Sequence, residues 1–465
     1  MTSAPTTKES LPQGTLVAWY GDDFTGSAAV MEVLAFSGLP SVLYLGVPTQ
    51  QQSSRFRNVR GIGIAGTARS HSPSWMRKHL PAIYMYLKSL RAPVNQYKVC
   101  STLDSSPAIG SIGCAIDIAQ DVFDSPWIPL FVAAPVMRRY QAFGHFFAGA
   151  PSGVFRLDRH PVMSRHPVTP MTESDVNLHL SLQTNRHTGL VDLEALTCAS
   201  AALSRLEHER SSGAEIIAID TVSPADLEIV GGLIWSSRDG GLFVVGSQGI
   251  EYALVAHWQS KGFIPHTQAP GGVGEVETIV VVSGSVSATT KEQIEWSLAN
   301  GFKGIALDAA CICRGDSAAN NAIDHAVDRA LQAIRMKASP IVYTACGPDD
   351  PAVIRFRDAV QASGMSAEMA NQRIGIALGR IVNETLRQSD LRRAVISGGD
   401  TSGHATAQLG IYALTALAPT IPGAALFQAH SEDPQVDGLQ LALKGGQMGT
   451  RDYFDWIRRG GGHSD

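Results

Sequence analysis

Short apolar runs alternate with polar or glycine-rich loops and with longer stretches of helical periodicity over most of this chain. The first unit is the apolar run 16–20, followed by the loop Gly21-Asp22-Asp23-Phe24-Thr25-Gly26 and a helical stretch from Ser27 to Phe36. Short apolar runs predict buried strands, and a period near 3.6 residues predicts helices. Regular alternation of the two is typical of α/β proteins, so we expect layered α/β sheets.

The same pattern predicts further strands in both halves of the chain. They cover residues 41–45, 97–100, 130–134, 216–220 and 242–245, and then 278–282, 305–307, 341–345 and 394–396. The run from Gly61 to Gly66 matches a dinucleotide-binding fingerprint literally, but its glycines lie inside an expected strand, so we discount that match. Residues 150–190 break the alternation with clustered arginines, histidines and prolines, and we expect an excursion or lid there.

The chain has 465 residues, which is long for a single core, so two domains are expected. A loop rich in glycine, proline and polar residues follows position 260 and is typical of a domain boundary. We expect a disordered lead-in over 1–14, an N-terminal domain over 15–260, a linker over 261–276 and a C-terminal domain over 277–465.

Composition and charge narrow the class of protein. Hydrophobic residues make up 44% of the chain and charged residues 17%, which is typical of a soluble globular protein. The formal net charge of −5 gives no footprint for nucleic acid or an anionic membrane. No apolar run approaches the ~20 residues needed to span a bilayer. The six cysteines are scattered without zinc spacing, and no secretory signal precedes them, so we expect reduced thiols and a cytoplasmic location.

Three loops of the C-terminal half offer amide donors, hydroxyls and one cation, a set that suits a polyphosphate. They are Ser283-Gly284-Ser285, the loop Ser397-Gly398-Gly399-Asp400-Thr401-Ser402 and Lys444-Gly445-Gly446. Asp400 could also hold a hydrated Mg²⁺. One such loop is as well explained by an ordinary strand-to-helix turn with a capping hydroxyl. Three together favour a nucleotide by roughly two to one. The chain has no P-loop motif.

The N-terminal half combines carboxylates with cations after its expected strands. Asp22 and Asp23 follow the first strand, where they could orient a hydroxyl, accept its proton or position Mg²⁺. The alternative is that one of them only caps the next helix. The other candidates for a small anionic substrate are Arg69, Lys98, Ser101, Asp104, Arg138, Arg139 and His166. Two such domains suggest phosphoryl transfer in an interdomain cleft.

Five segments in this order resemble the four-carbon acid sugar kinases, over nearly the whole chain. They are Asp22-Asp23-Phe24-Thr25-Gly26, Ser101-Thr102-Leu103-Asp104-Ser105, Ser283-Gly284-Ser285, Ser397 to Ser402 and Lys444-Gly445-Gly446. The segment His166-Pro167-Val168-Thr169-Pro170-Met171-Thr172 also looks like a family segment. The resemblance implies an N-terminal sugar-acid-binding domain, a C-terminal nucleotide-binding domain and ATP-dependent phosphorylation of a terminal hydroxyl, a phosphotransferase reaction with an alcohol acceptor.

The resemblance also implies roles for individual residues. Asp22 and Asp23 would face the substrate hydroxyl, one of them as general base, and Arg69, Lys98, Ser101 and Asp104 would line the acid-sugar pocket. Ser283, Ser285, Gly398 to Thr401 and Gly446 would hold ATP. To these the loop chemistry adds Arg138 and His166 for the substrate, Lys444 and Gly445 for the nucleotide, and Asp400 for Mg²⁺.

The segment around Ser101 resembles the branch that acts on 3-oxo acid sugars, because threonate and erythronate kinases more often carry Arg-Gly after Ser-Thr-Leu. This makes 3-oxo-tetronate the first choice of substrate and 3-oxo-isoapionate a close second, with threonate or erythronate behind them. Gly21, Ser27 and the continuation through Gly403-His404 depart from the commonest family pattern. A non-catalytic nucleotide or sugar-acid binder is the alternative of another class. The sequence leaves the oligomeric state open, a homo-oligomer included.

Overall fold

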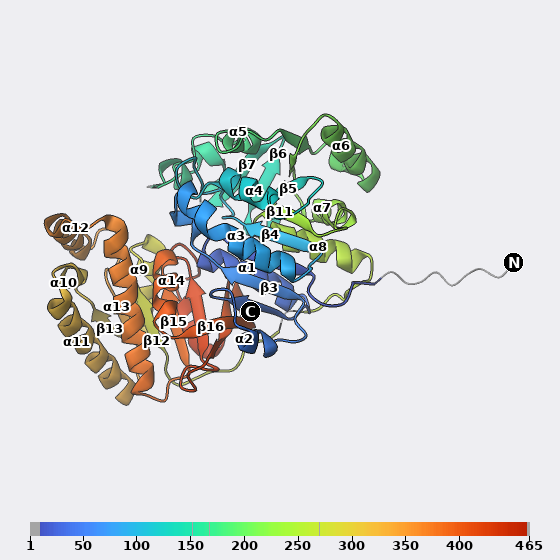
Figure 1. Ribbon diagram of the computed structural model, residues 1–465. Helices are drawn as coiled ribbons and strands as arrows, with labels where there is room; N and C mark the ends of the chain where they lie inside the picture. The colour runs from blue at the N-terminus through green and yellow to red at the C-terminus, as the bar shows by residue number, and fades with distance from the viewer. Residues whose placement is uncertain (1–9, 151, 167, 269, 463–465) are drawn as a thin grey trace. The chain divides into compact units, whose positions relative to one another are not determined.

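The computed structural model describes residues 10–462 except 151, 167 and 269, and does not describe the side chain of Asp400. Most of the expected lead-in therefore lies outside the described residues. The chain divides into two compact units, Met1–Gln268 and Ala269–Asp465 (Figure 1). Each unit contains a sheet with helices packed against it, which confirms the predicted α/β class with two domains.

Unit 1 is built on eight parallel strands in the order β2-β3-β1-β4-β11-β5-β10-β9. Their residues are almost all buried, as expected for parallel strands covered on both faces. The strands are β1 (Val17–Gly21), β2 (Ser41–Tyr44), β3 (Gly61–Ala65), β4 (Val94–Lys98), β5 (Ile128–Phe131), β9 (Thr188–Val191), β10 (Ile216–Ile219) and β11 (Leu242–Gly246).

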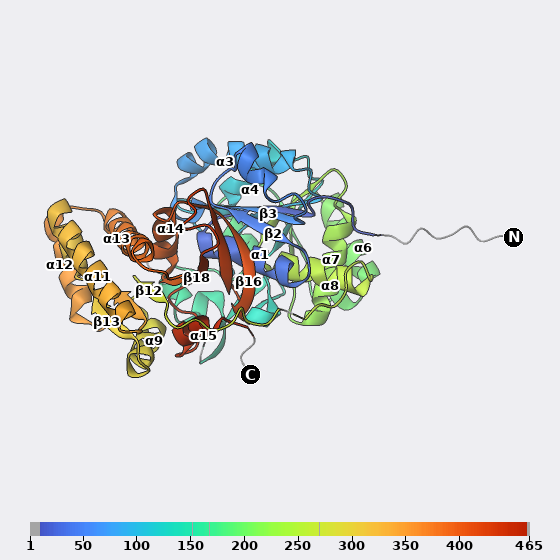
Figure 2. The same cartoon turned by 90° about the horizontal axis from the view of Figure 1, so that it is seen from below.

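Helices cover both faces of this sheet. Figure 2 shows α3 (Pro73–Ser89) and α4 (Ile112–Gln120) on one face, and α1 (Phe24–Phe36), α7 (Pro224–Ser236) and α8 (Gly249–Ser260) on the other. The chain leaves β1 toward one face and β4 toward the other. Since β1 and β4 are neighbours, their carboxyl ends form a topological switch point, where open α/β sheets bind ligands.

The glycines of the run 61–66 serve packing. Gly61 to Ala65 form β3, and a Cβ atom at Gly63 would lie 2.1 Å from the ring of Trp19 on the neighbouring strand. Trp19 is fully buried, so its indole occupies the space that a side chain at position 63 would need. This contact explains why a dinucleotide-like pattern occurs inside a strand. It agrees with the interpretation that residues 61–66 are not a dinucleotide-binding loop.

The expected excursion over 150–190 is partly ordered into regular structure. β6 (Arg139–Ala142), β7 (His145–Ala150) and β8 (Gly153–Arg156) form a separate antiparallel sheet. Three-residue 3₁₀ turns and the short α5 (Val176–Ser181) follow. The segment ends in β9, which joins the edge of the main sheet beside β10 and was not predicted as a strand. The remaining helices of unit 1 are α2 (Gln50–Ser54) and α6 (Ala199–Ser211).

The described residues of unit 2 form seven strands in the order β13-β14-β12-β15-β18-β17-β16. The first five are mutually parallel, and β17 and β16 are antiparallel additions. The long hairpin of β16 and β17 was not predicted. The strands are β12 (Val280–Ser283), β13 (Lys303–Ala306), β14 (Pro340–Tyr343), β15 (Arg393–Ser397), β16 (Ile411–Ile421), β17 (Ala424–Ser431) and β18 (Gln440–Lys444).

Unit 2 has its own switch point. On one face, α9 (Ala288–Ala299) and α15 (Tyr453–Arg459) enclose a core that includes Val281, Ile294 and Ile457. On the other face lie α11 (Asp316–Arg335), α13 (Ala367–Arg387) and α14 (Gly399–Ala407), which Figure 1 shows beside one another. The chain leaves β12 toward the first face and the neighbouring β15 toward the second, so the crevice falls where β12 and β15 end. The shorter α10 (Ala309–Cys313) and α12 (Pro351–Ser363) pack together at one end of the unit.

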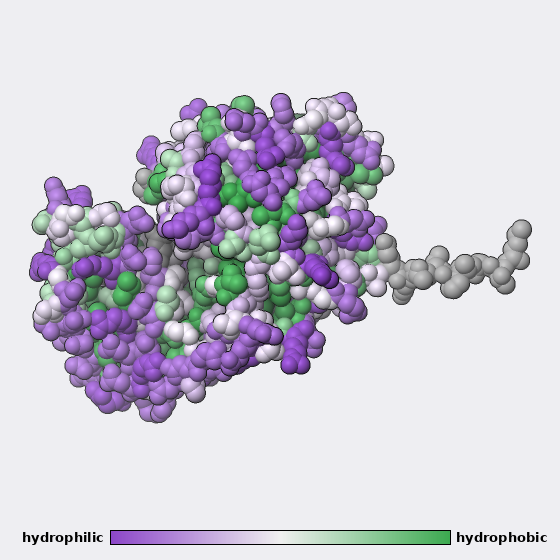
Figure 3. All heavy atoms as spheres, in the orientation of Figure 1, coloured by the Kyte–Doolittle hydropathy of each residue, from purple (hydrophilic) through white to green (hydrophobic). Residues whose placement is uncertain are grey.

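Polar residues cover most of the face drawn in Figure 3, with apolar residues in small groups among them. Among residues 10–462, apart from the three gaps, no helix is both long and apolar enough to cross a bilayer.

Candidate functional site

The predicted acidic pair lies at the switch point of unit 1. Asp22 follows β1 directly, and its backbone N–H donates to the carbonyl of Lys98 at the end of β4, 2.9 Å away. Asp23 is the N-cap of α1: its Oδ1 accepts from the backbone N–H of Gly26 at 2.9 Å, and its Oδ2 accepts from the Thr25 hydroxyl at 2.9 Å. The capping interpretation is therefore correct for Asp23, but a cap that also faces a crevice remains available for chemistry.

Arg69 joins both carboxylates. Its Nη2 lies 2.7 Å from Asp22 Oδ1 and 3.0 Å from Asp23 Oδ1, and its Nε donates to Asp22 Oδ2 at 3.3 Å. The Asp22 side chain is only 1% exposed, whereas that of Asp23 is 25% exposed. The two neighbours thus differ in access: Asp22 is enclosed with its guanidinium partner, and Asp23 presents part of its carboxylate to solvent.

The two carboxyls also differ in their affinity for a proton. Burial raises the pKa of Asp22, and the neighbouring charge of Asp23 adds to this rise against the opposing charge of Arg69. Burial acts in the same direction on Asp23, but the charges of Arg69 and Lys98 outweigh it and lower the pKa of Asp23. Asp23 is therefore the carboxylate that stays ionised and reachable.

Lys98 and Asp104 extend this cluster from β4 and the loop after it. Lys98 is 1% exposed, and its Nζ donates to the carbonyl of Val99 at 2.7 Å. A Cβ atom at Gly26 would lie 2.3 Å from Asp23 Oδ1 and 3.0 Å from Lys98 Nζ, so the ammonium and the Asp23 carboxylate share one small space. Asp104 is buried and accepts from the Thr102 hydroxyl at 2.9 Å. Ser101, on the same loop, is partly exposed.

The remaining predicted substrate residues have other local partners. Arg138 Nη1 donates to the carbonyl of Ala150, the last residue of β7, at 3.1 Å. His166 Nδ1 accepts from the backbone N–H of Thr169 at 3.1 Å within its own turn. Arg139 is half-buried, and its Nη1 donates to the carbonyls of Met137 and Gly149 at 3.1 and 3.4 Å, while its Nε has no hydrogen-bond partner among the described residues. Neither arginine of this basic pair forms an ion pair with a described carboxylate.

Sequence reasoning missed Glu251 in α8 altogether. Its side chain is fully buried beyond the end of β11, and neither carboxyl oxygen accepts a hydrogen bond from a described residue. Burial raises its pKa to about 8, against the charge of Lys98 and the amide of Gln96. Gln96 Nε2 in turn donates to the carbonyls of Gly246 and Ser247 at 3.3 and 3.0 Å. A lone Glu in an apolar helical stretch gave no signal, because ordinary helices carry many such residues.

In unit 2 the three predicted loops meet. Thr401 Oγ1 occupies the space beside Gly284 and Gly398, where Cβ atoms would lie 2.3 and 2.9 Å from it. The carbonyl of Gly446 accepts from the hydroxyls of Ser287 and Thr290, the latter at 2.8 Å. These contacts join the loop after β12 to the loops after β15 and β18. Ser287 and Thr290 were not predicted, although Ser287 is the N-cap of α9.

The Gly398 loop has the features of an anion site. Gly398 has φ of +127°, a conformation open to glycine, and α14 begins after it without a side-chain cap. The neighbouring Ser397 is fully buried, and its hydroxyl has no hydrogen-bond partner among the described residues. An uncapped helix N-terminus presents backbone N–H groups to a ligand. The donors therefore fit a phosphate. Gly399 lies in the first turn of α14, and Gly445 follows β18 directly.

Lys444, at the end of β18, is in register with Ser397 on the neighbouring β15. The whole residue is buried, yet its Nζ contacts only the carbonyl of Gly445 at 3.0 Å and the hydroxyl of Thr290 at 3.4 Å. Burial lowers the pKa of Lys444 to about 7. Asp400 lies in α14 by its backbone, but its side chain is outside what the structure describes. Among the described residues, no group of three His, Cys, Asp or Glu side chains forms a metal cage.

Comparisons with known proteins give a separate match for each half of the chain. A family model described as "Sugar-binding N-terminal domain" matches residues 17–254, and one described as "Nucleotide-binding C-terminal domain" matches 280–454. The chain is 43% identical to a 3-oxo-isoapionate kinase of Paraburkholderia graminis, over 97% of this chain and 95% of that protein. It is 27% identical to a 3-oxo-tetronate kinase of Cupriavidus necator, over 98% of this chain and 100% of that protein.

The chain belongs to the four-carbon acid sugar kinase family. The predicted membership and the predicted class, a phosphotransferase acting on a sugar acid, are thereby confirmed. The fold agrees as well: the crystal structure of Haemophilus influenzae protein HI1011 matches with a TM-score of 0.70 and 24% identity, over 95% of this chain and 99% of that one.

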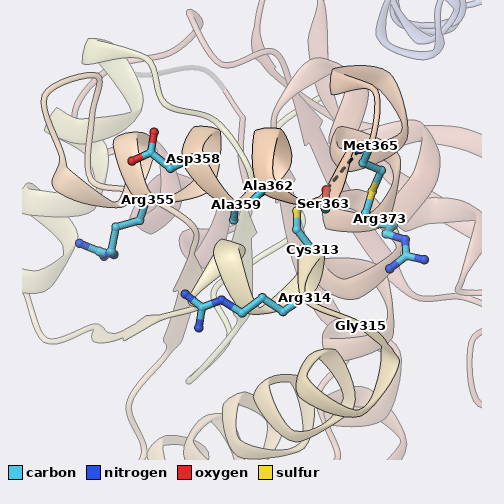
Figure 4. A pocket seen from close by; sticks show the side chains of 10 residues that line it. All are labelled: Cys313, Arg314, Gly315, Arg355, Asp358, Ala359, Ala362, Ser363, Met365 and Arg373. Atoms are coloured by element: carbon cyan, nitrogen blue, oxygen red, sulfur yellow. Dashed lines mark hydrogen bonds between the residues drawn. The ribbon is translucent and has the colours of Figure 1, made fainter.

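The large hollow of this kinase drawn in Figure 4 lies away from the predicted nucleotide residues. Its volume is about 770 Å³, and its lining comes from α10, α12, the start of α13 and the turns between them. Arg314 and Arg355 extend to one side of it and Arg373 to the other. Because the guanidinium groups do not converge, the hollow offers no focused anion site. The loops after β12, β15 and β18 remain the better candidate.

Proposed function

We propose that this kinase transfers the γ-phosphoryl group of ATP to the terminal hydroxyl of 3-oxo-isoapionate. The observation that carries the choice of substrate is the 43% identity to the 3-oxo-isoapionate kinase over nearly the whole chain. Several 3-oxo-tetronate kinases are only 25–28% identical to this chain. The resemblance of single segments favoured 3-oxo-tetronate, but whole-chain identity samples every residue that shapes the pocket.

In this proposal Asp23 is the general base. It is the more exposed of the two carboxylates, and it is held ionised by Arg69 and Lys98. A base must reach the hydroxyl proton within hydrogen-bond distance, which the enclosed Asp22 is poorly placed to do. Asp22 instead acts as a positioning residue that fixes the Arg69 guanidinium. Lys98, Ser101, Asp104 and Arg139 supply further polar contacts for the acid sugar, and Arg138 and His166 are further candidates from the sequence.

The nucleotide is assigned to the three loops of unit 2. Support comes from their mutual contacts, the uncapped start of α14 and the buried hydroxyl of Ser397. The residues proposed to hold ATP are Ser283, Ser285, Gly398, Gly399, Asp400, Thr401, Lys444, Gly445 and Gly446. Asp400 is proposed to hold Mg²⁺, which when bound neutralises charge on the transferring phosphoryl group.

A 3-oxo-tetronate kinase is the second candidate, favoured by the segment from Ser101 to Ser105. The experiment that tests both is ATP consumption by the purified chain with Mg²⁺ and, in turn, 3-oxo-isoapionate, 3-oxo-tetronate, threonate and erythronate. We expect the highest kcat/KM with 3-oxo-isoapionate. A higher value with 3-oxo-tetronate would overturn the choice of substrate. Silence with all four acids, together with measured ATP binding, would favour a binding protein that keeps the fold.

Four further expectations stay predictions. They are the linker over 261–276, an active site in an interdomain cleft, a cytoplasmic location and a homo-oligomeric state.

A further inference from the structure

The environment of Lys444 is unusual for a lysine. Buried ammonium groups are normally paired with a carboxylate, because transferring an unpaired charge from water into a protein is costly. No described carboxylate forms an ion pair with its Nζ, whose hydrogen-bond partners are the carbonyl of Gly445 and the hydroxyl of Thr290. The two polar atoms that it contacts, a carbonyl oxygen and a hydroxyl oxygen, carry no net charge. The site therefore provides hydrogen-bond partners for Nζ but no counter-ion.

The groups that face Lys444 come from every element packed around it. From α9 it meets the hydroxyl of Thr290, and from α15 the ring of Tyr453, whose centroid is 6.0 Å from Nζ. On β15 the residue in register is Ser397. α14 also packs against β18; its His404 lies against Gly375 of α13. Asp400, also on α14, has no described side chain, so the comparison excludes it.

We propose that Lys444 takes up a proton when a nucleotide phosphate binds to the three loops, so that the phosphate serves as its missing counter-ion. This inference rests on the proposed function. The pKa of about 7 supports it, because most Lys444 side chains are then neutral in the free chain at pH 8. A bound phosphate favours the charged form and raises the pKa of Lys444. The proton comes from the buffer, and no covalent bond forms or breaks.

This protonation would make the site selective for ligands that carry a phosphate. A neutral amine attracts small anions weakly, and the site gains a cation only for a ligand that places a phosphate beside Nζ. Ligands without such a phosphate, such as adenosine, must leave the amine neutral. Lys444 would thus act as a specificity-determining residue for the phosphate chain of the nucleotide. It complements the backbone N–H groups of the Gly398 loop, which are donors at any pH.

Isothermal titration calorimetry of the full chain tests this proposal, with MgADP as the probe because it binds without turnover. Titrations at pH 8.0 in buffers of different ionisation enthalpy give the number of protons taken up per nucleotide. A free pKa near 7 predicts an uptake of about 0.9 proton at pH 8.0, falling to about 0.2 at pH 6.5. The Mg²⁺-bound nucleotide is fully deprotonated at pH 8.0, so the uptake reports the protein.

Variants identify the group responsible. Lys444→Met keeps the length of the side chain without its amine, and we expect it to lose the uptake and to bind MgADP about tenfold more weakly. Lys303→Met, at an exposed position of β13, is the matched control and should keep the wild-type uptake. If Lys444→Met binds too weakly to measure, the fall in wild-type uptake between pH 8.0 and 6.5 still decides the question.

The outcomes separate the inference from the function on which it rests. MgADP binding without proton uptake, or with the same uptake in Lys444→Met, would overturn the role of Lys444 and leave the kinase assignment intact. No MgADP binding by the wild-type chain would instead overturn the nucleotide site itself.

Discussion

The two switch points of this protein differ in how their basic side chains are paired. At the end of β1 in unit 1, Arg69 is paired with Asp22 and Asp23, so the charges largely balance before any ligand arrives. At the end of β18 in unit 2, Lys444 is buried with a carbonyl and a hydroxyl and no described counter-ion. A site that is already balanced suits a hydroxyl and its small acid. A site with a buried amine and no counter-ion suits a ligand that brings the negative charges itself.

The largest effect is expected from removing the carboxylate that is proposed as the general base. We expect Asp23→Asn to lower kcat by about 10²- to 10⁴-fold, the usual contribution of a general base. Asparagine is also a good N-cap, so α1 should be preserved. Steady-state kinetics with the best acid of the panel gives kcat, and calorimetry should show unchanged MgADP affinity. Asp124→Asn, at an exposed position, is the control. Near-normal turnover by Asp23→Asn would show that another group accepts the proton.

The difference in charge pairing between Arg69 and Lys444 should appear in the free energy of unfolding of their variants. We expect Arg69→Met to lower the free energy of unfolding by about 3 kcal/mol, the low end for breaking a buried ion pair, since its side chain is 21% exposed. Lys444→Met should cause no such loss, because it leaves no charge behind. Urea unfolding of the two variants measures both values. Arg77→Met on the exposed face of α3 is the matched control. Equal destabilisation by both substitutions would mean that Lys444 has a counter-ion after all.

The remaining prediction concerns Glu251, the buried acid of unit 1. Its folded pKa of about 8 lies above the unfolded value of about 4.3, so the folded chain keeps a proton that the unfolded chain releases between these pH values. The stability that this proton contributes is therefore lost as pH rises from about 4.3 through 8. Glu251→Gln is neutral throughout and should flatten this fall.

Urea midpoints of the wild-type chain and Glu251→Gln between pH 5 and 8.5 measure the difference. Glu207→Gln, at an exposed position of α6, should follow the wild-type curve. A parallel pair of curves for the wild type and Glu251→Gln would mean that Glu251 is ionised in the folded chain. Glu251 would then be buried in its charged form, unlike the neutral amine proposed for Lys444 in the free chain.

Local patterns predicted much of the fold. Most strands of the two parallel sheets were recognised, because a parallel strand is buried on both faces and appears as a continuous apolar run. β18, which is parallel to β15, was not predicted. The hairpin of β16 and β17 was missed, since its many alanines give neither a strong apolar run nor a clear alternation. β9 was missed because it lies in a polar stretch and joins only the edge of its sheet. Such strands are specified by their neighbours more than by their own residues.

The sequence by itself determined which loops carry chemistry, because glycine, hydroxyl and carboxylate residues directly after apolar runs reveal where strands end and what they present. Only the tertiary structure decided how these residues are used. Asp22 and Asp23 look equivalent in the sequence, but one is enclosed with Arg69 and the other remains accessible. Arg138 and Arg139, likewise adjacent, donate to different backbone carbonyls, those of Ala150 and Met137. Burial, pairing and proton affinity depend on residues far apart in the chain, and these meet only when the sheets assemble.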